Sequence, residues 1–150
     1  MSGSPDTKPV EILLVEDDLA DIELTRHGLL DGKVANVLRV ARDGVEALEM
    51  LRGEGGAAEA VRPDLILLDL NMPRMDGRRF LADLKSDEDL KDITVVILTT
   101  SVSDRDLVET FDLHPDAYMN KPVDFDGLTG VVQSIWNFWF MVVRKTAIDD

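Results

Sequence analysis

Leu65-Ile66-Leu67-Leu68-Asp69 is the stretch of the chain that decides the fold. Its first four residues are large and aliphatic, and turn signals flank it, with Pro63-Asp64 before it and Pro73 after it. A short apolar run between turn signals indicates a strand that is buried on both faces of a parallel sheet. Because a carboxylate is rarely buried without a partner, Asp69 indicates a polar site where this strand leaves the core. In open α/β sheets, ligands bind at this carboxyl end of the strands.

Short apolar strands alternate with helical segments along the rest of the chain. The pattern predicts strands at residues 10–15, 37–41, 65–69, 94–99 and 117–120. It predicts helices at residues 19–30, between Asp43-Gly44 and Gly53, after Asp76-Gly77, at 103–111 and at about 124–143. The first of these helices carries apolar residues at Ala20, Leu24 and Leu29. The alternation predicts an α/β fold, with a parallel sheet and helices on both of its faces.

Composition sets limits on the class of protein. The chain has 150 residues, 45% of them hydrophobic and 31% charged, which is typical of one soluble globular domain. Its formal net charge of −14 disfavours nucleic acid and anionic membranes as direct partners, although solubility alone also explains an acidic surface. The absence of cysteine excludes disulfides and thiol nucleophiles and fits a cytoplasmic location. We find neither a signal peptide nor a membrane-spanning stretch, and we expect residues 1–9 to be a flexible tail.

Polar residues follow the predicted strands at the same end. Glu16-Asp17-Asp18 follows the first strand, Asp69 and Thr99 end the third and fourth, and Lys121 follows the fifth. In one parallel sheet these residues would share an edge, where crowded carboxylates repel one another unless a cation lies between them. Oxygen ligands suit Mg²⁺, and the backbone carbonyl of Asn71 could complete its shell. The set fits phosphoryl transfer to Asp69, with the hydroxyl and the lysine holding phosphate oxygens.

With these motifs in order, the chain resembles the receiver domains of two-component response regulators. The matching segments are Ile12-Leu13-Leu14-Val15-Glu16-Asp17-Asp18, Asp64 to Pro73, Met75-Asp76-Gly77, Val95 to Ser101 and Tyr118-Met119-Asn120-Lys121-Pro122. The spacings from Asp17 to Asp69 and from Asp69 to Lys121 are both 52 positions. The resemblance spans residues 10–143, with residues 144–150 as a C-terminal tail. It implies a flavodoxin-like (βα)5 fold, a doubly wound five-stranded parallel sheet of order 2-1-3-4-5.

The resemblance also implies a role for each site residue. Asp69 would be the phosphoacceptor, and the Mg²⁺ ligands would be Glu16, Asp17, Asp69 and the Asn71 main-chain oxygen. Thr99 would contact the phosphoryl group, and Lys121 would bridge phosphate and carboxylate. Tyr118 would be the aromatic switch, whose side chain turns inward when Thr99 moves toward the phosphate. A receiver of this kind is not an enzyme, because it catalyses only its own phosphorylation and dephosphorylation.

Plainer interpretations of the same residues stand beside these roles. The acidic run could cap the first helix, and for Asp18 a cap is the favoured interpretation. Lys121 could be a surface lysine, Thr99 an ordinary strand residue and Tyr118 an ordinary core aromatic. Two other classes of function are a phosphatase of the haloacid dehalogenase type and a phosphorylation-independent interaction module. The phosphatase would need an aspartate at position 71, where this chain has Asn71.

The last predicted helix is apolar on more than one side. One stripe can pack on the sheet, and it consists of Leu128, Val132, Ile135, Trp139 and Val142. A second stripe, Trp136, Phe140 and Val143, is expected to point elsewhere and must also be buried. We favour a homodimer through this stripe over a tail that folds back across it.

We expect no output domain, so the protein would act through protein contacts. Within the receiver family, the chain most resembles single-domain regulators that are paired with bacterial phytochrome histidine kinases. Three features carry this resemblance: the Leu19-Ala20-Asp21 start of the first helix, the Leu98-Thr99-Thr100-Ser101 strand end and the aromatic last helix.

Overall fold

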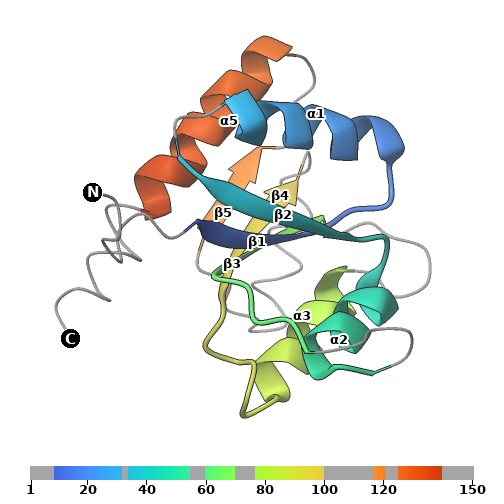
Figure 1. Cartoon of the computed structure of the whole chain (residues 1–150). Helices are drawn as coiled ribbons and strands as arrows, with labels where there is room; N and C mark the ends of the chain where they lie inside the picture. The colour runs from blue at the N-terminus through green and yellow to red at the C-terminus, as the bar shows by residue number, and fades with distance from the viewer. Residues whose placement is uncertain are drawn as a thin grey trace, which may run out of the picture.

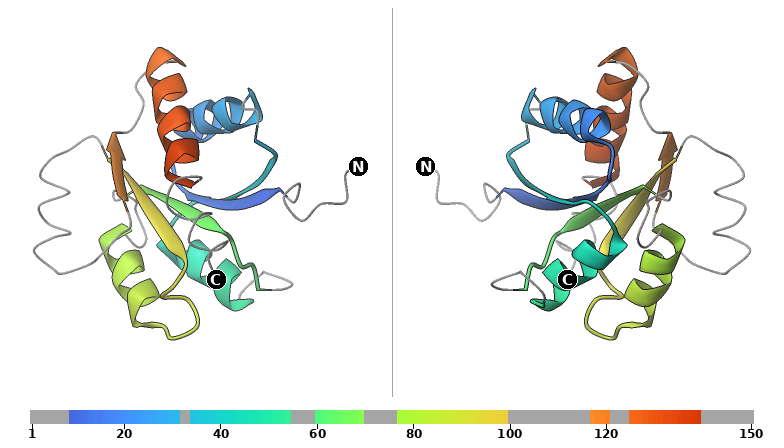
Figure 2. Two further views of the ribbon diagram at one scale, coloured as in Figure 1. Left: turned by 90° about the vertical axis from the view of Figure 1, so that its left-hand side faces the viewer. Right: turned by 90° about the vertical axis from the view of Figure 1, so that its right-hand side faces the viewer.

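The computed structural model describes residues 9–31, 34–54, 60–69, 77–99, 117–120 and 125–139. Five parallel strands form one sheet of order β2-β1-β3-β4-β5, namely β1 (Val10–Val15), β2 (Asn36–Ala41), β3 (Leu65–Asp69), β4 (Thr94–Thr99) and β5 (Ala117–Asn120). The described helices are α1 (Leu19–Asp31), α2 (Gly44–Arg52), α3 (Gly77–Ser86) and α5 (Phe125–Phe138). Helices α1 and α5 cover one face of the sheet, and α2 and α3 cover the other (Figures 1 and 2).

This arrangement confirms the predicted flavodoxin-like fold and its strand order. Four predicted strands have the predicted bounds, and β2 begins one residue earlier, at Asn36. The helix predicted at residues 103–111 lies outside the described residues. None of the described helices is long and apolar enough to cross a membrane.

Strand β3 lies between two apolar layers, one on each face of the sheet. All five of its residues are buried, because helices cover both faces of a parallel sheet. Ile66 and Leu68 belong to the cluster with α2 and α3, and Leu65 and Leu67 belong to the cluster with α1 and α5. The alternation of side chains along the strand divides the run between the two faces. The apolar run therefore holds both layers together and fixes the place where Asp69 emerges.

The helices that cover the sheet differ from the sequence prediction in which residues they bury. In α1 the buried residues are Ile22, Thr25 and Leu29, whereas Ala20 is exposed and Leu24 is half-buried. Thr25 is only 6% exposed, although its hydroxyl gave no apolar signal in the sequence. The buried residues of α1 follow helical spacing once this threonine is counted.

Trp136 lies in the core, so the predicted outward direction of its stripe is wrong at this residue. Its side chain is 6% exposed and packs with Val132 and Ile135 of α5. Trp139, which was assigned to the inward stripe, is half-buried beside the same cluster. The exposed residues of α5 form one polar side, namely Thr129, Gly130, Gln133, Ser134 and Asn137. Trp136 therefore belongs to the same wide apolar face as Val132 and Ile135, which the prediction had divided into two stripes. Among the described residues, the buried indole N–H of Trp136 has no hydrogen-bond partner.

Helix α2 has the two caps that its sequence predicts. Asp43 is extended at the N-cap, and its Oδ1 accepts the Glu46 N–H at 2.8 Å. Gly53 is the C-cap in the left-handed region, with φ of 69°, and its N–H donates to the Glu49 carbonyl. A Cβ atom at Gly53 would lie 3.0 Å from the Ala60 backbone nitrogen. Glycine is therefore required here by both backbone conformation and space.

We expect Gly53→Ala to lower the free energy of unfolding by about 1–2 kcal/mol, because the left-handed conformation and the contact with Ala60 both penalise a Cβ. Gly130→Ala is the matched control, because Gly130 lies inside α5 and a Cβ there would meet nothing within 4 Å. That substitution should raise the free energy of unfolding by about 0.5–1 kcal/mol. Urea denaturation of both variants measures the difference, and a loss of equal size in both would contradict this account.

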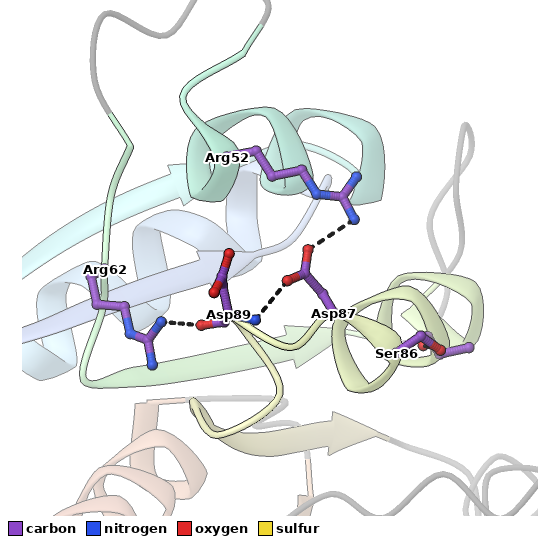
Figure 3. Close-up of polar contacts among 6 residues, drawn as sticks. Arg52, Arg62, Ser86, Asp87 and Asp89 are labelled. Carbon is purple, nitrogen blue, oxygen red and sulfur yellow. Dashed lines mark hydrogen bonds and ion pairs between the residues drawn. The ribbon is translucent and has the colours of Figure 1, made fainter.

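At the end of the sheet opposite Asp69, hydrogen bonds and an ion pair connect the neighbouring segments (Figure 3). The guanidinium of Arg52, at the end of α2, lies 3.4 Å from the Asp87 carboxylate that follows α3. Arg62 donates to the Asp89 carbonyl, and the Asp89 N–H donates to Asp87 Oδ1 at 2.9 Å. These contacts join the segment after α3 to α2 and to the chain that enters β3.

Candidate functional site

The register of the sheet brings Glu16 and Asp69 together. Val15 of β1 pairs with Leu68 of β3, so the residues that follow them leave neighbouring strands side by side. The Glu16 N–H also donates to the Ala41 carbonyl at 2.9 Å, which extends the pairing of β1 with β2 by one residue. The backbone of the predicted acidic site is therefore held by three adjacent strands.

Three carboxylates meet at this edge of the sheet. One oxygen from each of Glu16, Asp17 and Asp69 lies within 4.8 Å of the others. Glu16 is 2% exposed and Asp69 is 5% exposed, while Asp17 is half-buried. Buried carboxylates need a compensating charge or hydrogen bonds. The Asp18 N–H supplies one such hydrogen bond, to Glu16 Oε2 at 3.3 Å. The crowding of three carboxylates also favours a cation between them.

The donor set fits a hard divalent cation. Each carboxylate supplies oxygen, which is the ligand atom that Mg²⁺ and Ca²⁺ prefer. Two oxygens on opposite sides of one Mg²⁺ stand about 4.2 Å apart, because each bond is about 2.1 Å long. The separation of up to 4.8 Å among the carboxylates is close to this span, so small side-chain rotations would bring all three to one ion. The prediction that Glu16, Asp17 and Asp69 lie together is confirmed.

Asp18 has the capping role that the sequence favoured. It is exposed, and its Oδ1 accepts the Asp21 N–H at 3.1 Å. Its carbonyl accepts the Ile22 N–H at 2.9 Å, so it starts the first turn of α1. This residue fixes the direction of α1 and stays outside the carboxylate cluster.

The remaining predicted residues are described in part. Thr99 ends β4, one position beyond the Leu98 that pairs with Asp69, and its backbone pairs with Asn120 of β5. Tyr118 is half-buried and packs against the core cluster on the side of α2 and α3. The Thr99 side chain, Asn71 and Lys121 lie outside what the structure describes, so their roles stay predictions.

Arg42 also contacts the site, although no pattern in the sequence predicted this contact. Arg42 lies between β2 and α2, and its Nη2 donates to the Asp17 carbonyl at 3.3 Å. The one signal in the sequence was a basic residue immediately before the Asp43-Gly44 cap. A side chain that bonds to a backbone oxygen of another element leaves no spacing pattern by which it could be found.

Comparison with known proteins identifies the family. The model of the response regulator receiver domain matches residues 12–133. This chain belongs to the response regulator receiver family. The receiver domain is 42% identical over 139 residues to response regulator Rcp1 from Synechocystis, covering 93% of this chain and 95% of Rcp1.

Solved structures place the receiver domain near phytochrome response regulators. The phosphorylated cyanobacterial phytochrome response regulator RcpA matches with a TM-score of 0.80 and 45% identity, over 89% of this chain and 96% of RcpA. The Mn²⁺-bound form of Rcp1 matches with a TM-score of 0.79 and 41% identity, over 89% and 96% of the two chains. The bacteriophytochrome response regulator RtBRR matches with a TM-score of 0.73 and 39% identity, over 84% and 77%. One of these relatives is thus known in a phosphorylated form and another with a divalent metal.

Proposed function

We propose that this receiver domain accepts a phosphoryl group on Asp69 from a partner histidine kinase and thereby switches its contacts with other proteins. The observation that carries the proposal is the meeting of three carboxylates at the end of the sheet, with Glu16 and Asp17 beside a buried Asp69. Residues 10–143 would form the receiver domain, with residues 1–9 and 144–150 as flanking segments.

The transfer would be a displacement at phosphorus. An Asp69 oxygen forms the new P–O bond while the P–N bond to the donor histidine breaks, and the electron pair of that bond stays on the imidazole nitrogen. Lys121 would neutralise charge on the phosphoryl oxygens, and the Thr99 hydroxyl would donate a hydrogen bond to one of them. The same residues would serve the later hydrolysis of the acyl phosphate, so the protein would turn over no substrate but its own phosphoryl group.

Mg²⁺ is the metal that we propose for the site. Glu16, Asp17, Asp69 and the Asn71 main-chain oxygen would hold it, and it would supply positive charge to the transferred oxygens. The donors are all oxygen, which favours Mg²⁺ over metals that prefer nitrogen or sulfur. The Mn²⁺-bound form of Rcp1 shows that a relative binds a divalent ion, which supports the proposal of one here.

The phosphoryl group would act through its charge. The bound phosphoryl group carries about −1.5 to −2 but replaces the single negative charge of the Asp69 carboxylate, so the net gain is about −0.5 to −1. We propose that Thr99 and Tyr118 respond to this charge, and to the new phosphoryl oxygens, by adopting a second arrangement. Tyr118 is suited to this role because its half-buried ring can gain or lose contact with the core cluster beside it. The likeness to RcpA and RtBRR supports a phytochrome-type kinase as the donor. We also propose a cytoplasmic location, and the net charge of −14 supports a protein that has neither nucleic acid nor an anionic membrane as a partner.

A homodimer through the C-terminal helix stays part of the proposal. Trp136 is buried within its own chain and is a poor candidate for the contact. Phe140 and Val143, the other two residues of that stripe, lie outside the described residues. Light scattering at tens of micromolar separates a dimer from a monomer, and Phe140→Ala is the variant that should weaken the dimer.

Acetyl phosphate tests the proposed function without the kinase. We expect incubation with acetyl phosphate and Mg²⁺ to add the mass of one phosphoryl group, and hydroxylamine to remove it, because an acyl phosphate is labile to that nucleophile. Replacing Mg²⁺ with EDTA should prevent the gain, since the metal neutralises the transferred oxygens. Absence of any gain with Mg²⁺, or an equal gain in EDTA, would contradict the proposal.

A further inference from the structure

Three consecutive acidic residues follow β1, and different elements hold their backbones. The Glu16 N–H bonds to the end of β2, at the Ala41 carbonyl. The Asp18 backbone belongs to the first turn of α1, through the Ile22 N–H. Between them, the Asp17 carbonyl accepts from the side chain of Arg42 at 3.3 Å. The half-buried member of the carboxylate cluster is thus held by a side chain from the corner between β2 and α2.

The backbone of that corner is itself well fixed. Ala41, just before Arg42, is the last residue of β2 and pairs with Val15. Asp43, just after it, is 7% exposed and accepts the Glu46 N–H at 2.8 Å. Glu46 in turn accepts the Arg42 N–H through Oε2 at 3.4 Å, one residue before the N-cap. Because both neighbours of Arg42 are anchored, its guanidinium reaches across to the segment after β1 from a defined place.

We propose that Arg42 is a positioning residue for the divalent metal. By holding the Asp17 carbonyl, it keeps the Asp17 carboxylate within reach of Glu16 and Asp69, so that all three meet one ion. This inference rests on the proposed metal-dependent function and assigns to it a residue outside the carboxylate set. Groups that orient metal ligands contribute to metal affinity even though they do not touch the ion.

The positive charge of Arg42 predicts an effect on Mg²⁺ affinity that is opposite to that of positioning. A guanidinium beside the carboxylates repels a cation, so charge alone predicts that its removal tightens Mg²⁺ binding. Positioning predicts the opposite, because an Asp17 held only through Glu16 and Asp18 keeps more freedom, which is lost when the metal binds. The two effects differ in sign, and the direction of the change therefore decides between them.

Calorimetric titration of Mg²⁺ into the full chain, at constant ionic strength, tests the proposal. We expect Arg42→Met to raise the dissociation constant by about 3- to 10-fold, the size of one lost hydrogen bond. Arg42→Lys keeps a donor and the charge, so it should recover part of the affinity. Arg52→Met is the matched control, because Arg52 is also a surface arginine of the α2 region but contacts Asp87 at the other end of the sheet (Figure 3). Its dissociation constant should equal that of the wild type.

Two results would overturn the proposal. One is Mg²⁺ affinity in Arg42→Met that is unchanged or tighter than in the wild type. The other is a loss of affinity in Arg52→Met as large as in Arg42→Met, which would mean that general loosening of the fold is the cause. Urea denaturation without Mg²⁺ provides the second readout, and it should give similar stabilities for the two variants.

Acetyl phosphate separates this inference from the proposed function. A wild type that binds Mg²⁺ but gains no phosphoryl group would contradict the function and leave the Arg42 result to stand. A wild type that is phosphorylated, beside an Arg42→Met variant with unaltered Mg²⁺ affinity, would contradict only the positioning role.

Discussion

Asp69→Asn is expected to abolish phosphorylation by acetyl phosphate, with a loss of at least about a thousandfold in rate. The amide has nearly the shape of the carboxylate but lacks the negative oxygen that attacks phosphorus. Asp69 is 5% exposed at the end of a strand whose other residues are all buried, so an isosteric replacement disturbs the packing least. Mass spectrometry after incubation with acetyl phosphate and Mg²⁺ measures the loss.

Asp64→Asn is the matched control for this substitution. Asp64 precedes the same strand at its opposite end, where its Oδ2 accepts the Glu11 N–H at 2.8 Å. An asparagine can keep that hydrogen bond through its carbonyl oxygen. We expect the control to be phosphorylated at the wild-type rate, and a phosphoryl gain in Asp69→Asn equal to that of the control would refute the assignment of Asp69.

The charge of the cluster adds a further expectation for Asp69→Asn. Removing one of three carboxylates that lie within 4.8 Å of one another relieves repulsion in the metal-free protein. This relief of repulsion should raise the urea midpoint of the variant above that of the wild type, less the contribution of any hydrogen bond that the amide cannot keep. Groups that bind a ligand commonly reduce the stability of the ligand-free protein. A variant that is both inactive and unstable would point instead to a structural role for Asp69.

The strands were predictable because the residues within each strand are sufficient to mark it, without reference to its neighbours. A run such as residues 94–99 is apolar along nearly its whole length, and burial on both faces leaves little choice of structure. Their order in the sheet came from the family resemblance, since periodicity does not say which strands are neighbours. The carboxylates at the strand ends were predictable for the same reason, because parallel strands of known order end at one edge.

The helices and their contacts were harder to predict. The buried face of α1 includes Thr25, and Trp136 of α5 packs inward although the spacing allowed the opposite face. In α5 the prediction divided one wide apolar face into two stripes, although the polar residues, all on one side of the helix, mark the face that meets solvent. Arg42 was missed for a different reason: its partner is a backbone oxygen 25 residues away, which no side-chain pattern marks.

Phe80→Ala is expected to cost about 3–5 kcal/mol of unfolding free energy, the largest loss of stability that we predict for a single change. Phe80 is fully buried in α3 and belongs to the cluster that joins α2 and α3 to the sheet. The free energy of unfolding of a domain of this size is roughly 7–20 kcal/mol, so the variant should remain folded but unfold at a much lower urea concentration than the wild type.

Two further variants show whether the loss comes from the cavity. Phe80→Leu fills most of the space and should cost clearly less, about 1–2 kcal/mol. Arg79→Ala changes the neighbouring exposed position of the same helix and should stay within about 0.5 kcal/mol of the wild type. Because α3 starts only eight positions after Asp69, the packing of Phe80 should also affect the position of the chain next to Asp69. If the cluster holds α3 in place beside Asp69, Phe80→Ala should slow phosphorylation in buffer without urea, where the variant is folded. Phe80→Leu should be phosphorylated at the wild-type rate.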